Sequence, residues 1–215
     1  MTKISKIIIS IVIVLGVILF GIYYALIPSE RIDIVEGRLI TSEELLTGSF
    51  IDRVEVLKNP IRLQGKTSMS GEEFKNVIYT VMTEYNIKEL KNVYIDVNNN
   101  VIKVISPYKI LGFIDSQIET DLNLSVVDNN LNIKLTHVKL GKIKINDKTV
   151  SKELLAYERE IPFVVQDTSI IVDKKYTYPM TLNDVNIKEK DIIIDFQLEV
   201  NNLIDFISKY NVNVK

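Results

Sequence analysis

Hydrophobic residues form one long uninterrupted run near the start of the chain. Residues 7–27 contain no charged side chain, and 15 of these 21 residues are Ile, Val, Leu or Phe. A helix of this length rises about 31 Å, which matches the roughly 30 Å hydrocarbon core of a bilayer. Tyr23 and Tyr24 fall near its end, where aromatic rings favour the membrane–water interface, and Pro28 follows as a helix breaker. The pattern predicts a transmembrane helix over residues 7–27.

A cleaved signal peptide is the alternative interpretation of this run. Such peptides have an apolar stretch of about 7–15 residues followed by a cleavage site of small residues. The run here is longer, and residues 23–28 contain no such site, so the pattern favours an uncleaved anchor. Lys3 and Lys6 precede the run and favour a cytoplasmic tail over residues 1–6, although Arg31 and Arg38 make the basic balance nearly even. We expect the main domain to lie outside the cytoplasm.

Helical periodicity appears a second time after Ser70. The segment Ser70-Gly71-Glu72-Glu73 has the spacing of a capping box, in which the Ser and the second Glu each bond to the other's backbone N–H. The apolar positions that follow recur at helical spacing and form one face: Phe74, Val77, Ile78, Val81, Met82 and Tyr85. Shorter helices are predicted over residues 149–158 and after Asn202.

The period then changes from 3.6 to 2, which is typical of strands with one wet face. Alternation predicts a hairpin over residues 93–105, a longer hairpin that pairs 118–126 with 131–135, and a strong strand over 192–200. The apolar register slips near Thr136–Val138, where His137 falls on the apolar face and Val138 takes over from it. One extra residue there, a β-bulge, accounts for the slip.

These elements predict an α+β fold in which a long, mainly antiparallel sheet carries a few helices on its apolar face. We expect four segments along the chain. Residues 1–6 form the cytoplasmic tail, 7–27 the transmembrane helix, 28–67 a membrane-proximal segment, and 68–215 the extracytoplasmic domain.

Charge and composition narrow the partners. The chain has 26 Lys and Arg, of which Lys3 and Lys6 precede the predicted anchor, so 24 basic residues face 28 acidic ones beyond it. That mixed, mildly acidic balance offers no electrostatic footprint for nucleic acid. The chain contains no cysteine, which excludes disulfides and thiolate metal sites and favours a bacterial envelope protein over a disulfide-stapled secreted one.

Catalytic patterns are incomplete. His137 is the only histidine, which excludes a His cluster for a metal, and it lies in a strand without a nucleophile motif. Ser106–Lys109 matches Ser-x-x-Lys but is predicted to be a turn without the companion motifs.

Residues 96–100 copy only half of a calcium loop. Glu119 and Asp121 share a polar strand face, which is typical of solvated carboxylates. We predict no catalytic, metal-binding or cofactor-binding residue and a protein that is not an enzyme.

Long aliphatic faces remain as the candidate binding feature. The residues predicted to line a site for a hydrophobic ligand come from the capped helix and the longest strands: Phe74, Ile78, Val81, Ile118, Leu122, Leu124, Leu131, Ile133, Leu135, Ile194, Phe196 and Leu198. A filled core between sheet and helix gives the same pattern, so the sequence leaves open whether this face is a core or a groove.

A family resemblance covers the anchor and roughly residues 68–145. The short tail, the single membrane helix, the capped helix, the long strand pair and the segment Val138–Ile145, with its Leu140-Gly141 pair, together resemble the YpmS-like family of Gram-positive envelope proteins. The chain departs from the family pattern after Ile145, where no proline follows. The resemblance implies an anchored extracytoplasmic protein of the cell envelope that binds lipid, and it brings no catalytic residues.

The sequence therefore leads to one hypothesis with two rivals. The leading hypothesis is a non-enzymatic, membrane-anchored envelope protein that binds a lipid or another hydrophobic molecule. The alternative is a scaffold or interaction subunit of an envelope, secretion or sporulation assembly, with a protein partner docked on the sheet. An envelope hydrolase that uses Glu119 and Asp121 is the third. The sequence names no specific ligand, partner, process or oligomeric state.

Overall fold

The computed structural model describes residues 3–32, 35–41, 51–58, 61–87, 92–98, 101–159, 161–178 and 180–199. Within these ranges, the side chains of residues 3–10, 12, 51–54, 56, 58 and 61 fall outside the description. The helix predicted after Asn202 also lies outside the described residues. The described elements confirm an α+β fold whose strand pairs are all antiparallel.

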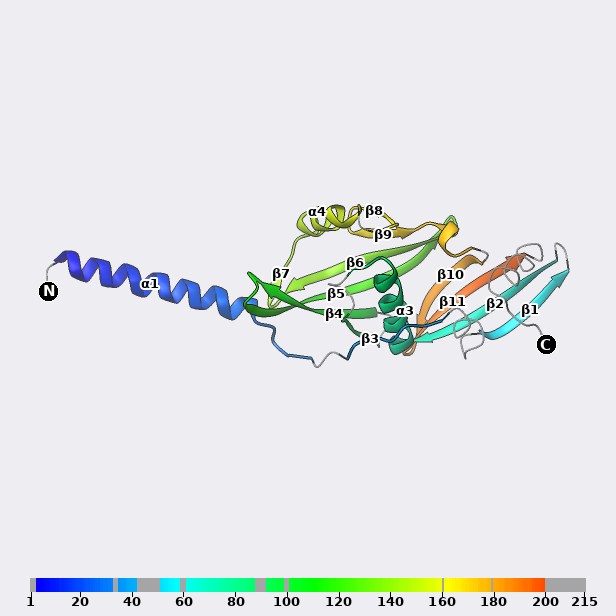
Figure 1. The fold of residues 1–215 in the computed structure, drawn as a ribbon, viewed down its shortest axis with the longest axis horizontal. Helices are drawn as coiled ribbons and strands as arrows, with labels where there is room; N and C mark the ends of the chain where they lie inside the picture. Colours follow the sequence, from blue (N-terminus) through cyan, green and yellow to red (C-terminus); the bar gives the residue numbers. More distant parts are fainter. Residues whose placement is uncertain are drawn as a thin grey trace.

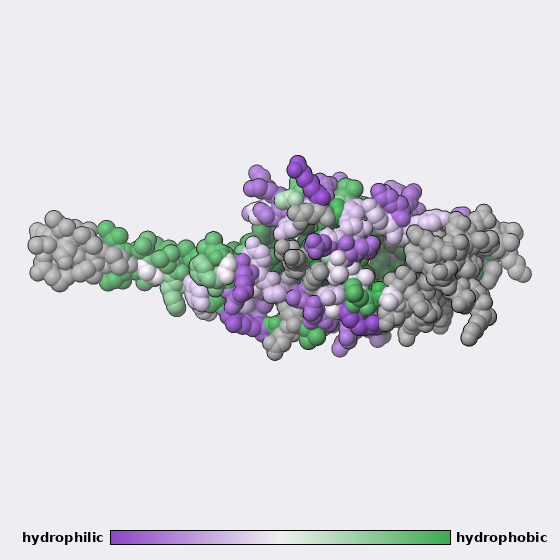
Figure 2. Space-filling view, in the orientation of Figure 1, coloured by the Kyte–Doolittle hydropathy of each residue, from purple (hydrophilic) through white to green (hydrophobic). Residues whose placement is uncertain are grey.

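The chain begins with one long helix, α1, over Lys3–Leu26. It projects from one end of the body along the long axis of the molecule (Figure 1). The large apolar side chains described on it, from Ile11 to Tyr24, are exposed, and its described surface is almost wholly hydrophobic (Figure 2). Among the residues that the structure describes, no helix combines the length and the hydrophobicity needed to cross a membrane.

The larger sheet has seven strands in the order β3-β4-β5-β6-β9-β8, with β7 paired to β6. Its strands are β3 Tyr94–Asn98, β4 Val101–Ile110, β5 Ile114–Val127, β6 Asn130–Leu140, β7 Ile143–Lys144, β8 Val164–Gln166 and β9 Ser169–Val172. The predicted hairpins are confirmed. Asp128 and Asn129 join β5 to β6 with φ of 51° and 64°, the left-handed pair that a tight hairpin turn requires.

The smaller sheet has four strands in the order β1-β2-β11-β10. They are β1 Ile51–Lys58, β2 Ile61–Ser70, β10 Thr181–Lys188 and β11 Asp191–Glu199. The prediction of one long sheet is therefore corrected to two. Strand β11 pairs along its whole length with β2, and β2 crosses position 67, where the membrane-proximal segment was predicted to end.

The helices of the body cap and cover the sheets. Helix α3, Gly71–Glu84, starts at the predicted capping box: Ser70 Oγ accepts from the Glu73 N–H at 3.3 Å, and Glu73 Oε2 accepts from the Ser70 N–H at 2.7 Å. It packs on β3 and β2. Helix α4, Asp147–Tyr157, begins at the N-cap Asn146 and packs on β8 and β6. A 3₁₀ turn, Lys174–Tyr176, precedes β10.

One apolar cluster joins the two sheets. Met69, Val185 and Ile192 of the four-stranded sheet meet Val97, Ile102 and Leu122 of the seven-stranded sheet, and all six are buried. Burial of such side chains contributes roughly 1.5–3 kcal/mol each. The hydrophobic core therefore lies between the two sheets, with Phe74 and Val77 of α3 packed against it.

Candidate functional site

The predicted hydrophobic lining falls mainly on the surface between the sheets, which we call the inter-sheet face. Leu122 belongs to the buried cluster there. Six further predicted residues pack against that cluster: Phe74, Leu124, Leu131, Ile133, Leu135 and Ile194. They come from α3, the β5–β6 hairpin and β11, which lie far apart in the sequence, so the fold brings most of the predicted set together.

Five predicted residues fall outside this cluster. Phe196 and Leu198 are buried farther along β11, and Ile78, Val81 and Ile118 are half-buried. Sequence reasoning also missed residues that belong to the cluster or pack against it. Val185 and Ile187 on β10 alternate with polar neighbours, and this alternation could have placed them on the inter-sheet face. Met69 follows no clear alternation.

Half-burial distinguishes the distal part of the β5–β6 hairpin from a closed core. Leu124, Val126, Leu131, Ile133 and Leu135 face the interior, yet each keeps part of its surface accessible. Inner side chains of a tightly packed two-sheet core are normally almost fully buried. These side chains offer only hydrocarbon surface, so they can bind an alkyl group by burial but cannot perform acid–base chemistry.

A second feature is the junction between α1 and the seven-stranded sheet. The last carbonyls of a helix have no partner within the helix, and here the sheet supplies donors. Ser116 Oγ donates to Leu26 O at 2.6 Å, and the Lys142 N–H donates to Ala25 O at 2.9 Å. Lys142 Nζ donates to Tyr24 O at 3.2 Å and sits 3.3 Å from the centre of the Tyr24 ring. A cation at this end also complements the helix dipole.

Gly141 makes this junction sterically possible. Its φ is +59°, in the left-handed region, and its N–H donates to Gln117 O at 2.9 Å. A Cβ there would clash with Leu26 O, would lie 2.6 Å from Leu26 C and would lie 2.9 Å from Ala25 O. Glycine is therefore required twice, for the backbone conformation and for the close approach of the helix end. The junction was not predicted from the sequence.

The segment that follows α1 is held along α3. The Arg38 N–H donates to Asn76 Oδ1 and the Ile40 N–H donates to Thr80 Oγ1, both at 2.9 Å. Tyr79 Oη donates to Glu36 Oε1 at 3.0 Å. This hydrogen bond to a carboxylate raises the pKa of Tyr79 above its usual value of 10.0, with smaller contributions from desolvation and the Glu36 charge.

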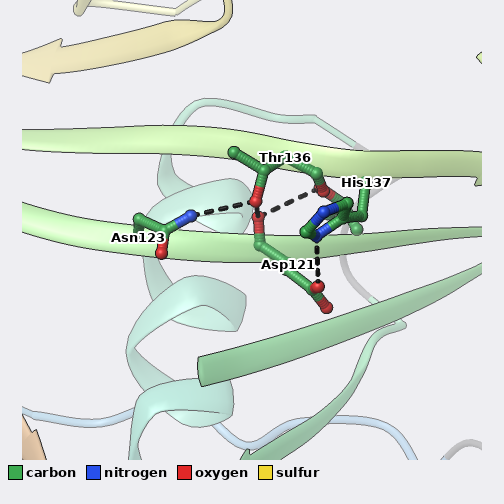
Figure 3. A network of polar contacts seen from close by, with 5 residues as sticks. Asp121, Asn123, Thr136 and His137 are labelled. Carbon is green, nitrogen blue, oxygen red and sulfur yellow. Dashed lines mark hydrogen bonds and ion pairs between the residues drawn. The ribbon is translucent and has the colours of Figure 1, made fainter. Parts of the chain in front are cut away.

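The predicted β-bulge is confirmed and creates a polar network around His137. Glu119 pairs with Lys139 but Asp121 pairs with Thr136, so β6 carries one extra residue, and His137 has a φ of 52°. His137 Nδ1 lies 2.9 Å from Asp121 Oδ2, and Asn123 Nδ2 donates to Thr136 Oγ1 at 2.9 Å (Figure 3). The prediction of a bulge histidine missed this contact with Asp121.

This network lacks the geometry of a catalytic triad. The hydroxyl of the preceding residue, Thr136 Oγ1, donates to the backbone oxygen of Asp121 at 3.3 Å, and the His137 side chain is 70% exposed. Glu119 accepts a hydrogen bond from Gln117 Nε2 at 2.9 Å and, like Asp121, is half-buried, so the expectation of two solvated carboxylates is corrected. No group of three His, Cys, Asp or Glu residues that could bind a metal exists among the described residues.

The Ser-x-x-Lys match lies on a strand instead of the predicted turn. Ser106, Pro107 and Lys109 all belong to β4. Residues three apart on a strand point to opposite faces; Ser106 is buried, whereas Lys109 is exposed and pairs with Asp115 at 3.6 Å. The hydroxyl and the amine therefore cannot act on one substrate atom.

Comparison with family models, with curated proteins and with solved structures finds no match to this chain. The resemblance to the YpmS-like family stays a prediction.

Proposed function

We propose that this chain is a non-enzymatic, single-pass membrane protein of the bacterial cell envelope. In this proposal α1 anchors the chain, the α+β body lies outside the cytoplasm, and the inter-sheet face receives the hydrocarbon part of a lipid. The half-burial of the aliphatic side chains on the β5–β6 hairpin is the observation that carries the lipid-binding function.

The length and surface of α1 support the anchor. Helix α1 has 24 residues, a rise of about 36 Å for a hydrocarbon core of roughly 30 Å, although its described residues alone are not long and apolar enough to cross a membrane. The described side chains between Ile11 and Tyr24 include many exposed aliphatic groups, a surface that water disfavours and lipid accepts. The side chains of residues 3–10 and 12, which complete the predicted span, lie outside the described part.

The junction supports a function close to the bilayer. Ser116 and Lys142 hydrogen-bond to the last backbone carbonyls of α1, and Gly141 leaves room for the helix end, so the body does not hang from a free linker. In the proposal, a lipid that leaves the membrane therefore meets a sheet held at a fixed distance from the bilayer. The mixed, mildly acidic charge of the residues beyond the anchor does not favour nucleic-acid binding as a rival function.

A filling substitution tests the lipid proposal. Ile133 lies half-buried on the inter-sheet face, and Val127 is 55% exposed on the outer face of the same hairpin. We expect the full chain, extracted in mild detergent, to carry lipid in native mass spectrometry. Ile133→Trp should carry less lipid with little change in Tm, whereas Val127→Trp should carry the wild-type amount.

A filled core predicts a different result. Overpacking of a closed interior costs about 1–3 kcal/mol, so Ile133→Trp would then lower the Tm clearly. If the wild-type chain also carries no lipid, the inter-sheet face is only a core and the lipid proposal fails.

A scaffold remains the second candidate because β3 ends the strand order of the seven-stranded sheet. A terminal strand presents backbone donors and acceptors to a further strand. Residues Tyr94, Asp96 and Asn98 of β3 are exposed. Photocrosslinking from position 96 in cells should trap one dominant protein if this edge binds a partner, and none if lipid binding is the whole function.

A further inference from the structure

Two of the most exposed large apolar side chains of the body lie together at the turn between β4 and β5. Leu111 is 80% exposed and Phe113 is 74% exposed, and they flank Gly112, which has a φ of +77°. We call residues 111–113 the hairpin tip. Single exposed apolar residues are common on soluble proteins, whereas exposed apolar side chains that lie together mark a candidate contact surface.

The position of the hairpin tip identifies what covers it. Strand β5 starts at Ile114, and its third residue, Ser116, donates to Leu26 O at the end of α1. The hairpin tip is thus attached directly beside the end of the proposed anchor. Figure 1 shows the β4–β5 end of the sheet at the end of the body from which α1 projects.

Reach supports the same conclusion. Three residues of extended chain, from Ser116 to Phe113, span up to about 10 Å. Along the helix, Tyr24 lies only about 3 Å from Leu26. The hairpin tip is therefore long enough to reach the level of Tyr23 and Tyr24, the aromatic pair that marks the interface end of the anchor.

Charge around the hairpin tip fits a lipid surface. Lys109 lies on β4 next to the tip, Lys142 lies on the neighbouring turn between β6 and β7, and Lys144 lies on β7. Asp115 is the acidic residue of the same hairpin end and pairs with Lys109. Lysines beside exposed apolar side chains match phosphate headgroups above an acyl layer.

We propose that the hairpin tip inserts Leu111 and Phe113 into the interface of the same bilayer that α1 crosses, as a second membrane contact. This inference rests on the proposed anchor. Together with the junction, it fixes the tilt of the body on the membrane, because two separated contacts define an orientation that one helix alone leaves free.

Single-cysteine labelling tests the hairpin tip, since the chain has no cysteine of its own. Four variants of the full chain, Leu111→Cys, Phe113→Cys, Ile18→Cys and Val127→Cys, carry the polarity-sensitive fluorophore NBD. Each is reconstituted in vesicles of phosphatidylcholine and phosphatidylglycerol, with and without lipids that bear a quenching doxyl group on the acyl chain. Ile18 reports the anchor, and Val127, exposed at the opposite end of β5, is the matched control.

We expect blue-shifted emission and doxyl quenching at positions 18, 111 and 113, and neither at position 127. Quenching at 18 without quenching at 111 and 113 overturns the inference and leaves the anchor intact. Quenching at 111 and 113 without quenching at 18 contradicts the anchor, and with it the inference that the hairpin tip is a second contact on a bilayer that α1 crosses. Unquenched labels at all four positions contradict both. Tm values equal to wild type establish that each labelled chain is folded.

Discussion

Substitution of Gly141 by alanine is the most specific way to disturb the link between α1 and the sheet. An added Cβ would clash with Leu26 O and lie 2.9 Å from Ala25 O. The helix end must move away to relieve this contact, and the donors Ser116 Oγ and Lys142 N–H then lose their carbonyl acceptors. The substitution should therefore detach α1 from the body while leaving both sheets folded.

The magnitude follows from two separate costs. Alanine in a left-handed conformation costs about 1–2 kcal/mol. Loss of the two junction hydrogen bonds adds about 1 kcal/mol each. The second cost, about 2 kcal/mol, lowers the ratio of docked to undocked helix by a factor of about 30.

Gly112→Ala separates these two costs. Gly112 also has a left-handed φ, of +77°, but no atom lies within 4 Å of the position where its Cβ would be. Both substitutions should lower the stability of the body by a similar amount. Only Gly141→Ala should release the helix.

Distance measurement by pulsed electron paramagnetic resonance reads the release directly. One spin label is placed at Val17, about nine helical residues before the junction, and the other at Ser125, about nine strand residues beyond it. These two lengths together place the labels roughly 40 Å apart in the docked state. We expect one narrow distance distribution for wild type and Gly112→Ala, and a broad one for Gly141→Ala. A distribution for Gly141→Ala as narrow as that of Gly112→Ala would refute the account of the junction.

Three further substitutions have defined outcomes. Ser116→Ala removes one donor of the junction at a cost of about 1 kcal/mol and should broaden the same distance distribution less than Gly141→Ala does. His137→Gly should change the free energy of unfolding in urea by less than about 1 kcal/mol, because glycine suits the φ of 52° and a single polar contact of a side chain that is 70% exposed contributes little. Tyr79→Phe should remove a late-titrating tyrosine from an ultraviolet pH titration, because the bond to Glu36 raises the pKa of Tyr79.

The pH dependence of the last variant has a definite sign. The pKa of Tyr79 in the folded state lies above the unfolded value of 10.0. The hydrogen bond from Tyr79 to Glu36 therefore stabilises the fold fully below pH 10, and this contribution is lost as the pH rises through the raised pKa. The stability difference between wild type and Tyr79→Phe should therefore be present at neutral pH and vanish in strong alkali. Exposed Tyr94 and Ser125 give the matched controls Tyr94→Phe and Ser125→Ala. If the stability difference between wild type and Tyr79→Phe grows with pH, the account of the Tyr79–Glu36 bond is wrong. If His137→Gly lowers the free energy of unfolding by more than about 2 kcal/mol, the account of His137 is wrong.

Local patterns predicted the elements well because their determinants are local. The capping box at Ser70 fixes the start of α3 through bonds three residues apart. The register slip at residues 136–138 predicts the bulge because each strand residue must keep its face. Pro107 misled the prediction: β3 stops pairing with β4 at Ile105, so β4 continues there as an edge, where proline is tolerated.

The arrangement of the elements depended on contacts that the sequence does not encode locally. Alternation indicates which face of a strand is apolar but not which strand is its neighbour, so two sheets were predicted as one. The junction joins Ser116 to Leu26 across 90 positions and Lys142 to Tyr24 across 118. The Leu140-Gly141 pair ahead of alternating Ile143 and Ile145 was the trace that this contact left in the sequence.

Membrane extraction combined with surface labelling tests the central claim, that α1 anchors the body outside the cytoplasm. The full-length Val127→Cys chain is expressed in bacteria, treated with a membrane-impermeant maleimide on intact cells, and extracted with alkaline carbonate. We predict that the chain stays in the carbonate-washed membrane and is labelled before lysis. Recovery of the intact chain in the carbonate supernatant, or labelling only after lysis, would contradict the account.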